Sequence, residues 1–449
     1  MRKISLTFLS LLLLPALTIA GQDRQLSMVE CIELSRQNNP RVANAALSVT
    51  AAQAQRHEAR ASWFPTVSAS AGGFKALNPM VSVGLDDVLG SSDAANTLRY
   101  YAETVAGLGA VGTEWTTLGQ GYAAGLSVTQ PLYAGGRIAT GNALAALGVK
   151  AADAQRDLAL RQNDDSVAVK YCNIIALQGK RNALEQGIAL TEKLESDVSA
   201  AVDAGLARPS DLMQVQLKEH ELQAQLVQLQ SGVRLARMDL FNLIGLDYEA
   251  DDLDSFVLTD SFDALSSPDA YRQDLSDKAA AMDENRLLDF SVKAKQLQRH
   301  MTLGEALPTV GLGASMGYGQ LIGEPRFNGM VYALVSVPLT DWTKTSRKLQ
   351  RAKCAQLQAE NDRDYLQKQL AVKVGKDWME LQTAWDLLAA AREALTLSEK
   401  LEAQKRAEYD AGLCTLAELL QTQTDLQAAR SRLIDAQSAY ARTVTIWQR

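Results

Sequence analysis

The tetrapeptide Asp-Ala-Gly-Leu occurs at 203–206 and again at 410–413, 207 residues further along the chain. Glycine directly after a helix-forming segment is a helix stop signal, so each copy predicts the end of a helix and a tight turn. Pro131 and Pro338 are also 207 residues apart. The segment from each proline to its tetrapeptide therefore aligns without a gap, which indicates an internal duplication.

A third motif, Pro-Thr-Val, occurs at 65–67 and 308–310, 243 residues apart. The difference between the two spacings, 243 − 207 = 36, measures extra residues in the first copy, at roughly 76–120. These residues are polar and Gly-rich, and we expect them to form a loop. The predicted organisation is a signal peptide at 1–20, a first repeat at 21–246, an acidic linker at 247–270 and a second repeat at 271–449.

The segments 137–204 and 343–411 have the composition of long helices. Both lack proline and are rich in Ala, Leu, Gln, Lys and Glu, which favour helix. At 1.5 Å per residue, each would be about 100 Å long. After each turn, apolar residues recur every three or four positions, the heptad spacing of a coiled coil. The sequence therefore predicts two antiparallel helical hairpins, at 137–245 and 343–447.

Shorter helices are predicted ahead of each Pro-Thr-Val motif. They cover roughly 40–62 in the first repeat and 271–305 in the second, and a small helix at 27–37 precedes the first of them. The small helix is closed by Asn38, Asn39 and Pro40, because proline disfavours a helical conformation in the residue before it.

Four segments alternate apolar residues with small or polar ones, at about 63–74, 121–133, 308–319 and 328–339. Runs of about ten residues with period two are typical of strands that cross a membrane with one face toward lipid. Each run taken alone fits an ordinary sheet equally well. Trp63 and Trp342 lie where strands meet helices, which suits an interfacial aromatic belt and equally suits simple packing.

Four strands cannot close a membrane barrel by themselves. An open sheet edge is not tolerated in lipid, and known single-chain barrels begin at about eight strands. If these strands span a membrane, several chains must share one barrel. Three chains would supply twelve strands and a tube of helices.

The N-terminus has the pattern of a secretory signal peptide. Met-Arg-Lys is followed by an apolar run that ends in small residues at 18–20. An uncleaved anchor is the alternative, but the run is shorter than the about 20 apolar residues of a membrane span. Residue 21 is glycine and not cysteine, so no lipid attachment is expected. We expect the mature protein to leave the cytoplasm.

Composition and motifs argue against several functional classes. The net charge of −7 and the lack of a basic stripe argue against a nucleic-acid binder. The cysteines at 31, 172, 354 and 414 form no CxxC motif, so we expect mostly free, buried thiols and no structural zinc. The three histidines are far apart, and no catalytic motif accompanies them.

Two further patterns resemble binding sites but are better explained otherwise. The glycines at 107–112 match GxGxxG, yet no acidic residue follows about 20 positions later, and we interpret them as a flexible loop. Acids are frequent in the linker at 247–270, without the spacing of a calcium loop. A solvated linker is favoured over a metal site. The sequence therefore predicts no cofactor, no metal and no enzyme activity.

Acidic residues stand just beyond both predicted turns. Asp211 and Glu418 each lie six residues after the turn glycine. If the hairpins form a symmetric tube, each acid becomes a ring that favours cations. Acids in a first helical turn also complement the helix dipole. Both explanations can hold together.

These features together resemble the TolC-like outer-membrane efflux proteins over the whole mature chain. The resemblance is carried by the order of the Pro-Thr-Val motifs, the paired long helices ending at Asp-Ala-Gly-Leu, and the opening segment 28–40. Helices 40–62 and 209–243, stacked end to end, would extend about 87 Å, close to one long helix. That stacking is the arrangement the family uses.

The resemblance implies a fold that is mainly α, with a twelve-stranded barrel shared by a homotrimer in the outer membrane of a Gram-negative bacterium. The barrel would continue as a helical periplasmic tunnel. The implied function is a passive exit duct for drugs and small molecules or for type I protein secretion. Its partners would be a periplasmic adaptor protein and an inner-membrane transporter of the RND, ABC or MFS type. The extra residues at 76–120 would lengthen the first outer loop.

The resemblance also assigns roles near the turns. Tyr409 and Asp211 match a pair that helps to latch the closed aperture, and Glu418 matches the first of two acidic gate residues. Gln421 stands in place of the second acid, and Cys414 in place of a latch arginine. We therefore expect a weaker latch and a single charged ring. The residues that match adaptor-contacting tips are Ala204, Gly205, Leu206, Ala411, Gly412 and Leu413.

Two other classes of protein remain as alternatives. One is a soluble periplasmic coiled-coil adaptor or scaffold, in which the strands would form a separate small domain. The other is an enzyme built on a helical scaffold. Strand alternation at membrane length argues against the first, and the lack of converging catalytic residues argues against the second.

Overall fold

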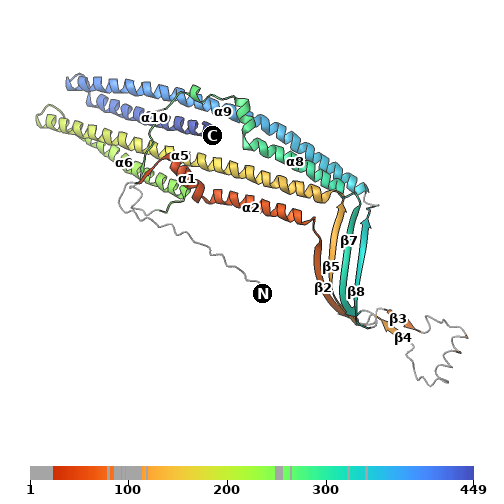
Figure 1. Cartoon of the computed structure of the whole chain (residues 1–449). Helices are drawn as coiled ribbons and strands as arrows, with labels where there is room; N and C mark the ends of the chain where they lie inside the picture. Colours follow the sequence, from red (N-terminus) through yellow and green to blue (C-terminus); the bar gives the residue numbers. More distant parts are fainter. Residues whose placement is uncertain are drawn as a thin grey trace, which may run out of the picture. The chain divides into compact units, whose positions relative to one another are not determined.

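Four long helices form two antiparallel hairpins in the computed structural model, which describes residues 24–77, 81–84, 93, 97, 114–117, 120–247, 256–262, 265–320, 324–338 and 342–448 (Figure 1). Helix α5 (Arg137–Asp203) is followed by α6 (Pro209–Ile244), and α9 (Trp342–Asp410) by α10 (Leu416–Gln448). The predicted pair of long hairpins, one in each repeat, is therefore confirmed. The predicted signal peptide and the GxGxxG segment lie outside the described residues.

The chain divides into two compact units that cut across the two repeats. The helical unit takes in the described residues of Met1–Ser48, Asp153–Arg286 and Leu366–Arg449. The sheet unit takes in those of Val49–Ala152 and Leu287–Tyr365. Each unit thus contains equivalent pieces of both repeats, as expected if the duplicated halves pack side by side.

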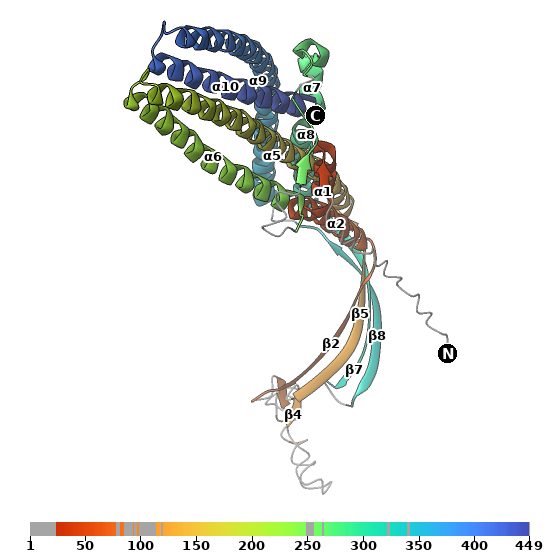
Figure 2. The ribbon, with the colours of Figure 1, turned by 90° about the vertical axis from the view of Figure 1, so that its left-hand side faces the viewer.

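The sheet unit contains four antiparallel strands in the order β2-β5-β7-β8. The strands are β2 (Thr66–Lys75), β5 (Gln120–Ala134), β7 (Thr309–Gln320) and β8 (Arg326–Ser336). They form a curved sheet (Figure 2). Each repeat contributes two strands, as the alternation predicts. Of the two interfacial tryptophans, Trp63 is half exposed, and the side chain of Trp342 lies outside the described part.

A short hairpin in the extra segment was not predicted. Strand β3 (Val81–Gly84) pairs with β4 (Glu114–Thr117) in an antiparallel two-stranded sheet. Most other residues between them lie outside the described ranges. The sequence gives no clear signal for these strands, because four residues are too few for an alternating pattern to be recognised.

In the first repeat, two asparagines join the short helices to the end of α6. Helix α1 (Met28–Asn38) starts at a capping box formed by Ser27 and Glu30, and α2 (Pro40–Ala61) follows directly. The Asn38 amide donates to the carbonyl of Ile244 at 3.2 Å, and the Asn39 amide to that of Leu243 at 2.9 Å. These carbonyls have no partner within their own helix. The joint therefore caps α6 where α2 begins.

The second repeat caps its equivalent helix end with different residues. Lys278 Nζ donates to the carbonyl of Trp447 at 2.5 Å and lies 4.5 Å from the centre of the tryptophan ring. The indole N–H of Trp447 donates to the carbonyl of Tyr271 at 2.8 Å. Burial lowers the pKa of Lys278, but its cation still complements the carboxyl end of the α10 dipole.

The predicted helix at 271–305 is wrong in its first part. A 3-10 turn η2 (Pro268–Tyr271) comes first, then α7 (Leu275–Ala281), and then α8 (Asp283–Gly304). Asp274 caps α7 by accepting from the backbone N–H groups of Ser276 and Asp277, at 2.8 and 3.2 Å. Met282 is extended, with φ −64° and ψ 140°, so the helix stops and restarts. Helix-forming composition alone did not indicate this break.

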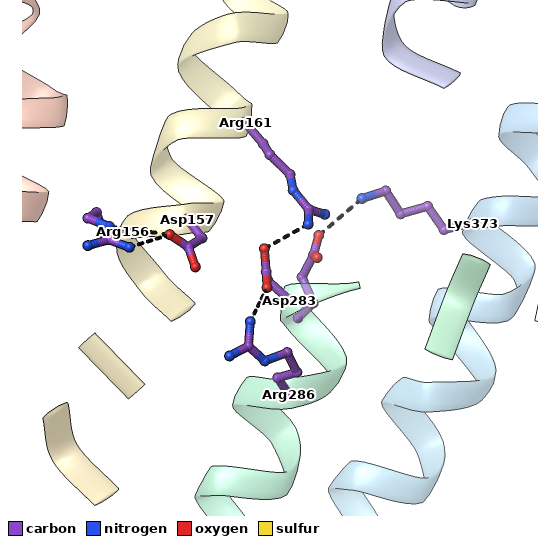
Figure 3. A network of polar contacts seen from close by, with 7 residues as sticks. Arg156, Asp157, Arg161, Asp283, Arg286 and Lys373 are labelled. Atoms are coloured by element: carbon purple, nitrogen blue, oxygen red, sulfur yellow. Dashed lines mark hydrogen bonds and ion pairs between the residues drawn. The ribbon is translucent and has the colours of Figure 1, made fainter. Parts of the chain in front are cut away.

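A network of charged side chains holds the first turn of α8, where the helix resumes after Met282 (Figure 3). The carboxylate of Asp283 is 3% exposed and pairs with Arg161 of α5 at 3.0 Å and with Arg286 at 2.9 Å. Beside it, Glu284 pairs with Lys373 of α9 at 3.4 Å. First-turn acids also complement the dipole of their own helix. Two acids therefore tie α8 to both long helices.

The acidic linker is only partly a solvated connection. Strand β6 (Phe256–Leu258) pairs in parallel with β1 (Arg24–Leu26). Asp260 accepts from the backbone N–H of Met28 at 2.8 Å, and the hydroxyl of Tyr171 donates to the Leu26 carbonyl at 2.9 Å. The small sheet covers a core around Cys31, Tyr171 and Phe241. Strands β1 and β6 have three residues each, which is too short for an alternating sequence pattern to reveal them.

All four cysteines are free, but only two of them are buried. Cys31 and Cys172 lie in the core, Cys354 is exposed and Cys414 is half-buried. Burial raises the pKa of Cys31 to about 12 and that of Cys172 to about 11. The expectation of mostly buried thiols is therefore wrong for Cys354, which lies on α9.

No helix within the described ranges is long and apolar enough to cross a membrane.

Replacing Asp283 with alanine should destabilise the helical unit by about 1–3 kcal/mol, because it leaves two arginines without their shared buried acceptor. The half-exposed pair of Arg156 and Asp157, also drawn in Figure 3, is the matched control. Asp157→Asn should change stability by at most about 1 kcal/mol. The midpoint of urea unfolding of the purified protein measures both. Equal effects of the two substitutions would contradict a special role for the buried acid.

Candidate functional site

The two hairpin turns have the same backbone geometry. Gly205 and Gly412 both have φ of 72°, a conformation that glycine adopts without strain. The backbone N–H of Leu206 donates to Ala201 at 2.8 Å, and that of Leu413 to Glu408 at 2.7 Å. Both are the long bond of a Schellman motif, which satisfies the carbonyls at a helix end. The duplicated tetrapeptide therefore encodes a duplicated turn.

Each turn presents a large apolar side chain to the surroundings. The leucine after each turn glycine is 85% exposed at Leu206 and 78% exposed at Leu413. Single exposed leucines are common, but two at equivalent positions of a duplicated turn are not explained by packing within the chain. These turns, with Ala204 and Ala411, are called the tips below.

Just behind the tips, the two hairpins share an apolar cluster. Its buried members come from α5, α6 and α10: Leu194, Val198, Val215, Leu416 and Leu419. Tyr409 of α9 packs against this cluster with its side chain half-buried. All four long helices therefore meet here, and the predicted site residues surround the place where they meet.

Tyr409 and Asp211 lie near each other, but each makes its main contact with another group. Burial raises the pKa of Tyr409, and the nearby Asp211 carboxylate raises it further. Asp211 lies in the first turn of α6 and accepts from the backbone N–H of the N-cap residue Arg208 at 3.2 Å. Between these two described residues no hydrogen bond forms. The first-turn explanation for Asp211 is therefore observed directly.

Glu418 is paired with a lysine across its hairpin. Lys405 of α9 lies 3.3 Å from Glu418 and 2.8 Å from Glu408. The two carboxylates raise the pKa of Lys405, Glu408 first, and the lysine lowers the pKa of Glu408. The three groups together carry a net charge of about −1.

Sequence analysis missed Lys405, although a signal was available. Lys405 precedes Gly412 by seven residues and Glu418 follows it by six. In an antiparallel hairpin, residues at about the same distance from the turn face each other. The same rule relates Glu195 and Gln216 around Gly205, and their side chains are hydrogen-bonded at 2.8 Å.

The two positions that depart from the family pattern make local contacts. Gln421 donates to Asp425, one turn further along α10, at 3.0 Å. Cys414 lies with its Sγ 3.4 Å from the carbonyl of Lys405, and burial raises the pKa of its thiol. Neither contact links one hairpin to the other.

An arginine on α9 makes the link between hairpins that Cys414 does not make. Arg406 lies 2.7 Å from Asp197 of α5 and 3.6 Å from Asp410 of its own helix. The first of these pairs joins residues 209 positions apart. No local pattern in the sequence identifies it.

The sheet unit presents two chemically distinct faces. The apolar face consists of ladders whose members lie opposite one another across the strands, such as Val67, Val128, Ala314 and Val331. The polar face carries small residues at the alternating positions, such as Ser68, Ser127 and Ser315, and ends in Met330. This is the two-sided pattern of a strand between lipid and a wet lumen. A hollow of about 570 Å³ along the sheet is lined by residues of both alternating sets, among them Ser70, Ser127, Met316 and Asn328.

Within the described ranges, no group of three or more His, Cys, Asp or Glu residues is arranged to hold a metal ion. The three histidines belong to the separate helices α2, α6 and α8.

Comparison with known proteins identifies both repeats. The family model described as "Outer membrane efflux protein" matches residues 31–246 and 289–445. A search of curated proteins finds no match.

Several solved structures share the fold at low sequence identity. The chain is similar to the outer membrane protein VceC of Vibrio cholerae, with TM-score 0.71, 15% identity and coverage of 94% of this chain and 96% of that one. For the CmeC outer membrane channel of Campylobacter jejuni, the TM-score is 0.72 at 14% identity, with coverage of 93% and 84%. For the open state of the MtrE outer membrane channel of Neisseria gonorrhoeae, it is 0.70 at 16% identity, with coverage of 94% and 88%.

Proposed function

The chain belongs to the outer membrane efflux protein family, and we propose how its own residues serve that role. In this proposal, the two tips receive a periplasmic adaptor protein, and charged residues behind the tips hold the aperture closed and select for cations. The observation that carries the proposal is the pair of identical turns, each with an exposed leucine.

Membership of the family establishes the general function. The protein is an efflux channel of the outer membrane of Gram-negative bacteria, is trimeric as the family implies, and is not an enzyme. The alternatives of a soluble scaffold and of a helical enzyme are therefore wrong.

The tips are suited to a helical partner that docks end-on. Leu206 and Leu413 offer apolar contacts, and the tight turns keep the surrounding backbone rigid. Three chains would present six tips in a ring. An adaptor would bridge this ring to an inner-membrane transporter of the RND, ABC or MFS type, for export of drugs and small molecules or for type I secretion of polypeptides.

The latch in this chain combines two contacts between the hairpins. Tyr409 of the second hairpin faces the charge of Asp211 in the first, close enough for the carboxylate to raise the pKa of the phenol. Arg406 is bonded to Asp197 directly, and we assign it the task of the latch arginine that Cys414 replaces. Opening would separate these partners as the hairpins move apart.

The proposed gate has one acidic residue in each chain, Glu418, and its charge is partly offset by a nearby lysine. Glu418 would repeat as a ring of three in the trimer and attract cations. Lys405, at 3.3 Å, offsets part of that charge. With Gln421 neutral, we expect weak cation selectivity.

Docking at the tips is tested by photo-crosslinking in cells. A photoreactive amino acid at Leu413 or Leu206 should capture a periplasmic adaptor with a long helical hairpin, identified by mass spectrometry. The same residue at Leu47, which is 64% exposed on α2, is the control and should not capture it. If Leu413 and Leu47 give the same products in a well-folded protein, the docking assignment is wrong.

Breaking the pair of Arg406 and Asp197 should favour the open channel. Arg406→Gln should raise the ratio of open to closed time in planar bilayers by up to about fivefold, since exposed ion pairs contribute about 1 kcal/mol at most. Asp197→Asn should have the same effect, and the double variant should add little. Lys376→Gln removes an exposed pair within α9 and should leave gating unchanged. If neither Arg406→Gln nor Asp197→Asn alters the ratio of open to closed time, the latch assignment is wrong.

Substitutions at the gate should change ion selectivity in opposite directions. Glu418→Gln removes the acid and should lower the preference for cations. Lys405→Gln removes its counter-charge and should raise that preference. The reversal potential in a salt gradient measures both, and a value unaffected by either variant would contradict the gate assignment.

A further inference from the structure

Strands β2 and β8 form the two edges of the four-stranded sheet and each pair with only one strand of their own chain. In lipid, the backbone groups of a strand must all be satisfied by protein partners. Edge strands also readily pair with another chain. The trimer that the family implies must therefore join β8 of one chain to β2 of the next, and the internal duplication indicates in which register.

The duplication preserves strand register within the chain. In the first repeat, Thr66 of β2 lies opposite Thr129 of β5. Adding the repeat offsets of 243 and 207 residues gives Thr309 of β7 and Ser336 of β8, and these two residues are indeed opposite each other. The same offsets relate every pair of the β2–β5 ladder to a pair of the β7–β8 ladder. Equivalent strand pairs therefore keep the same register in both repeats.

The junction of β5 with β7 joins the first repeat to the second. Around a closed ring of chains, the next junction joins the second repeat of one chain to the first repeat of its neighbour. There β8 takes the position of β5, and the partner's β2 takes the position of β7. The pairs Val128–Ala314 and Gln130–Leu312 of the internal junction are thus the template for the junction between chains.

We propose the register of this antiparallel junction: Val335 of β8 lies opposite the partner's Ala71, and Val337 lies opposite the partner's Ala69. Both pairs follow from the internal junction by the two repeat offsets. The proposal rests on the trimer implied by the family and not on the tips. A failure of the docking proposal would leave this register unaffected.

The chemistry of the two faces agrees with this register. Val335 lies opposite Val310 within the chain, and Ala71 lies opposite Ala124, so both belong to the apolar face. Pairing them keeps that face continuous across the junction. A shift by one residue would place Val335 opposite the partner's Ser70 and mix the two faces. On the other face, Leu334 would lie opposite the partner's Gly72, a large residue beside a small one.

Strand β8 is shorter than its equivalent β5, and the proposed junction between chains explains the difference. Strand β5 covers 15 residues and β8 covers 11. The last residues of β5 extend beyond β2 and are held by β7 alone, as in the pairing of Ala134 with Thr309. Val337, the equivalent of Gln130, lies just past the end of β8. In the trimer, the partner's β2 would extend β8 through Val337.

Paired cysteines on the two strands test the register. Residues directly opposite each other in an antiparallel pair have Cα atoms about 4.5–5.5 Å apart, within reach of a disulfide. Diagonal neighbours about 7–8 Å apart are not. The matched double variants are Ala71→Cys with Val335→Cys, and Ala69→Cys with Val337→Cys. The shifted controls recombine the same four substitutions: Ala71→Cys with Val337→Cys, and Ala69→Cys with Val335→Cys.

The experiment uses the full chain in outer membranes, in a background of Cys354→Ser and Cys414→Ser that leaves only the buried native thiols. After oxidation, the matched variants should shift from the band of one chain to those of two and three chains on a non-reducing gel, and reductant should reverse the shift. Native mass spectrometry of each single-cysteine variant verifies that trimers form. Cross-linking in the shifted pairs instead, or in none of the four while the trimers are intact, would overturn the proposed register.

Discussion

A long helix needs a packing partner along its whole length, and the rest of this structure depends on how the chain meets that need. Isolated helices are marginal in water, and most of their stability comes from an apolar face buried against neighbours. Helix α5 has 67 residues and α9 has 69, but the helices beside them are about half as long or shorter. Each long helix is therefore accompanied by two shorter ones that meet at a joint. The joints are the places where unsatisfied carbonyls arise and must be capped.

The two repeats cap their joints with different chemistry at equivalent places. The first uses the amides of Asn38 and Asn39, and the second uses Lys278, while the indole of Trp447 donates to the carbonyl of Tyr271. In the second repeat, α7 and α8 are separated by the extended residue Met282, and Asp283 at the start of α8 pairs with Arg161 of α5. Duplication has thus preserved the arrangement of the helices, while the side chains that satisfy it have diverged. The same divergence at the tips leaves an acid-lysine cluster behind one turn and a capping acid behind the other.

The sheet unit obeys a stricter requirement than the helical unit. Helix joints can be satisfied by any suitable donor, but the backbone of a strand in lipid needs a partner strand in one particular register. This explains why both repeats keep the same strand register, with the same residue offsets along both ladders. A single chain satisfies three of the junctions between its strands, and the fourth must come from another copy.

The sequence by itself determined the features that depend on local periodicity. These are the duplicated turns at Gly205 and Gly412, the two hairpins, and the four alternating strands, because helix and strand periods are written into every few residues. It placed Asp211, Tyr409 and Glu418 near the turns, since distance along a helix follows from residue number. The tertiary structure alone decided their partners: Lys405 for Glu418, Asp197 for Arg406, and Arg161 for Asp283. Such pairs depend on the rotation and stagger of one helix against another, which arise from packing over many residues and leave no local pattern to read.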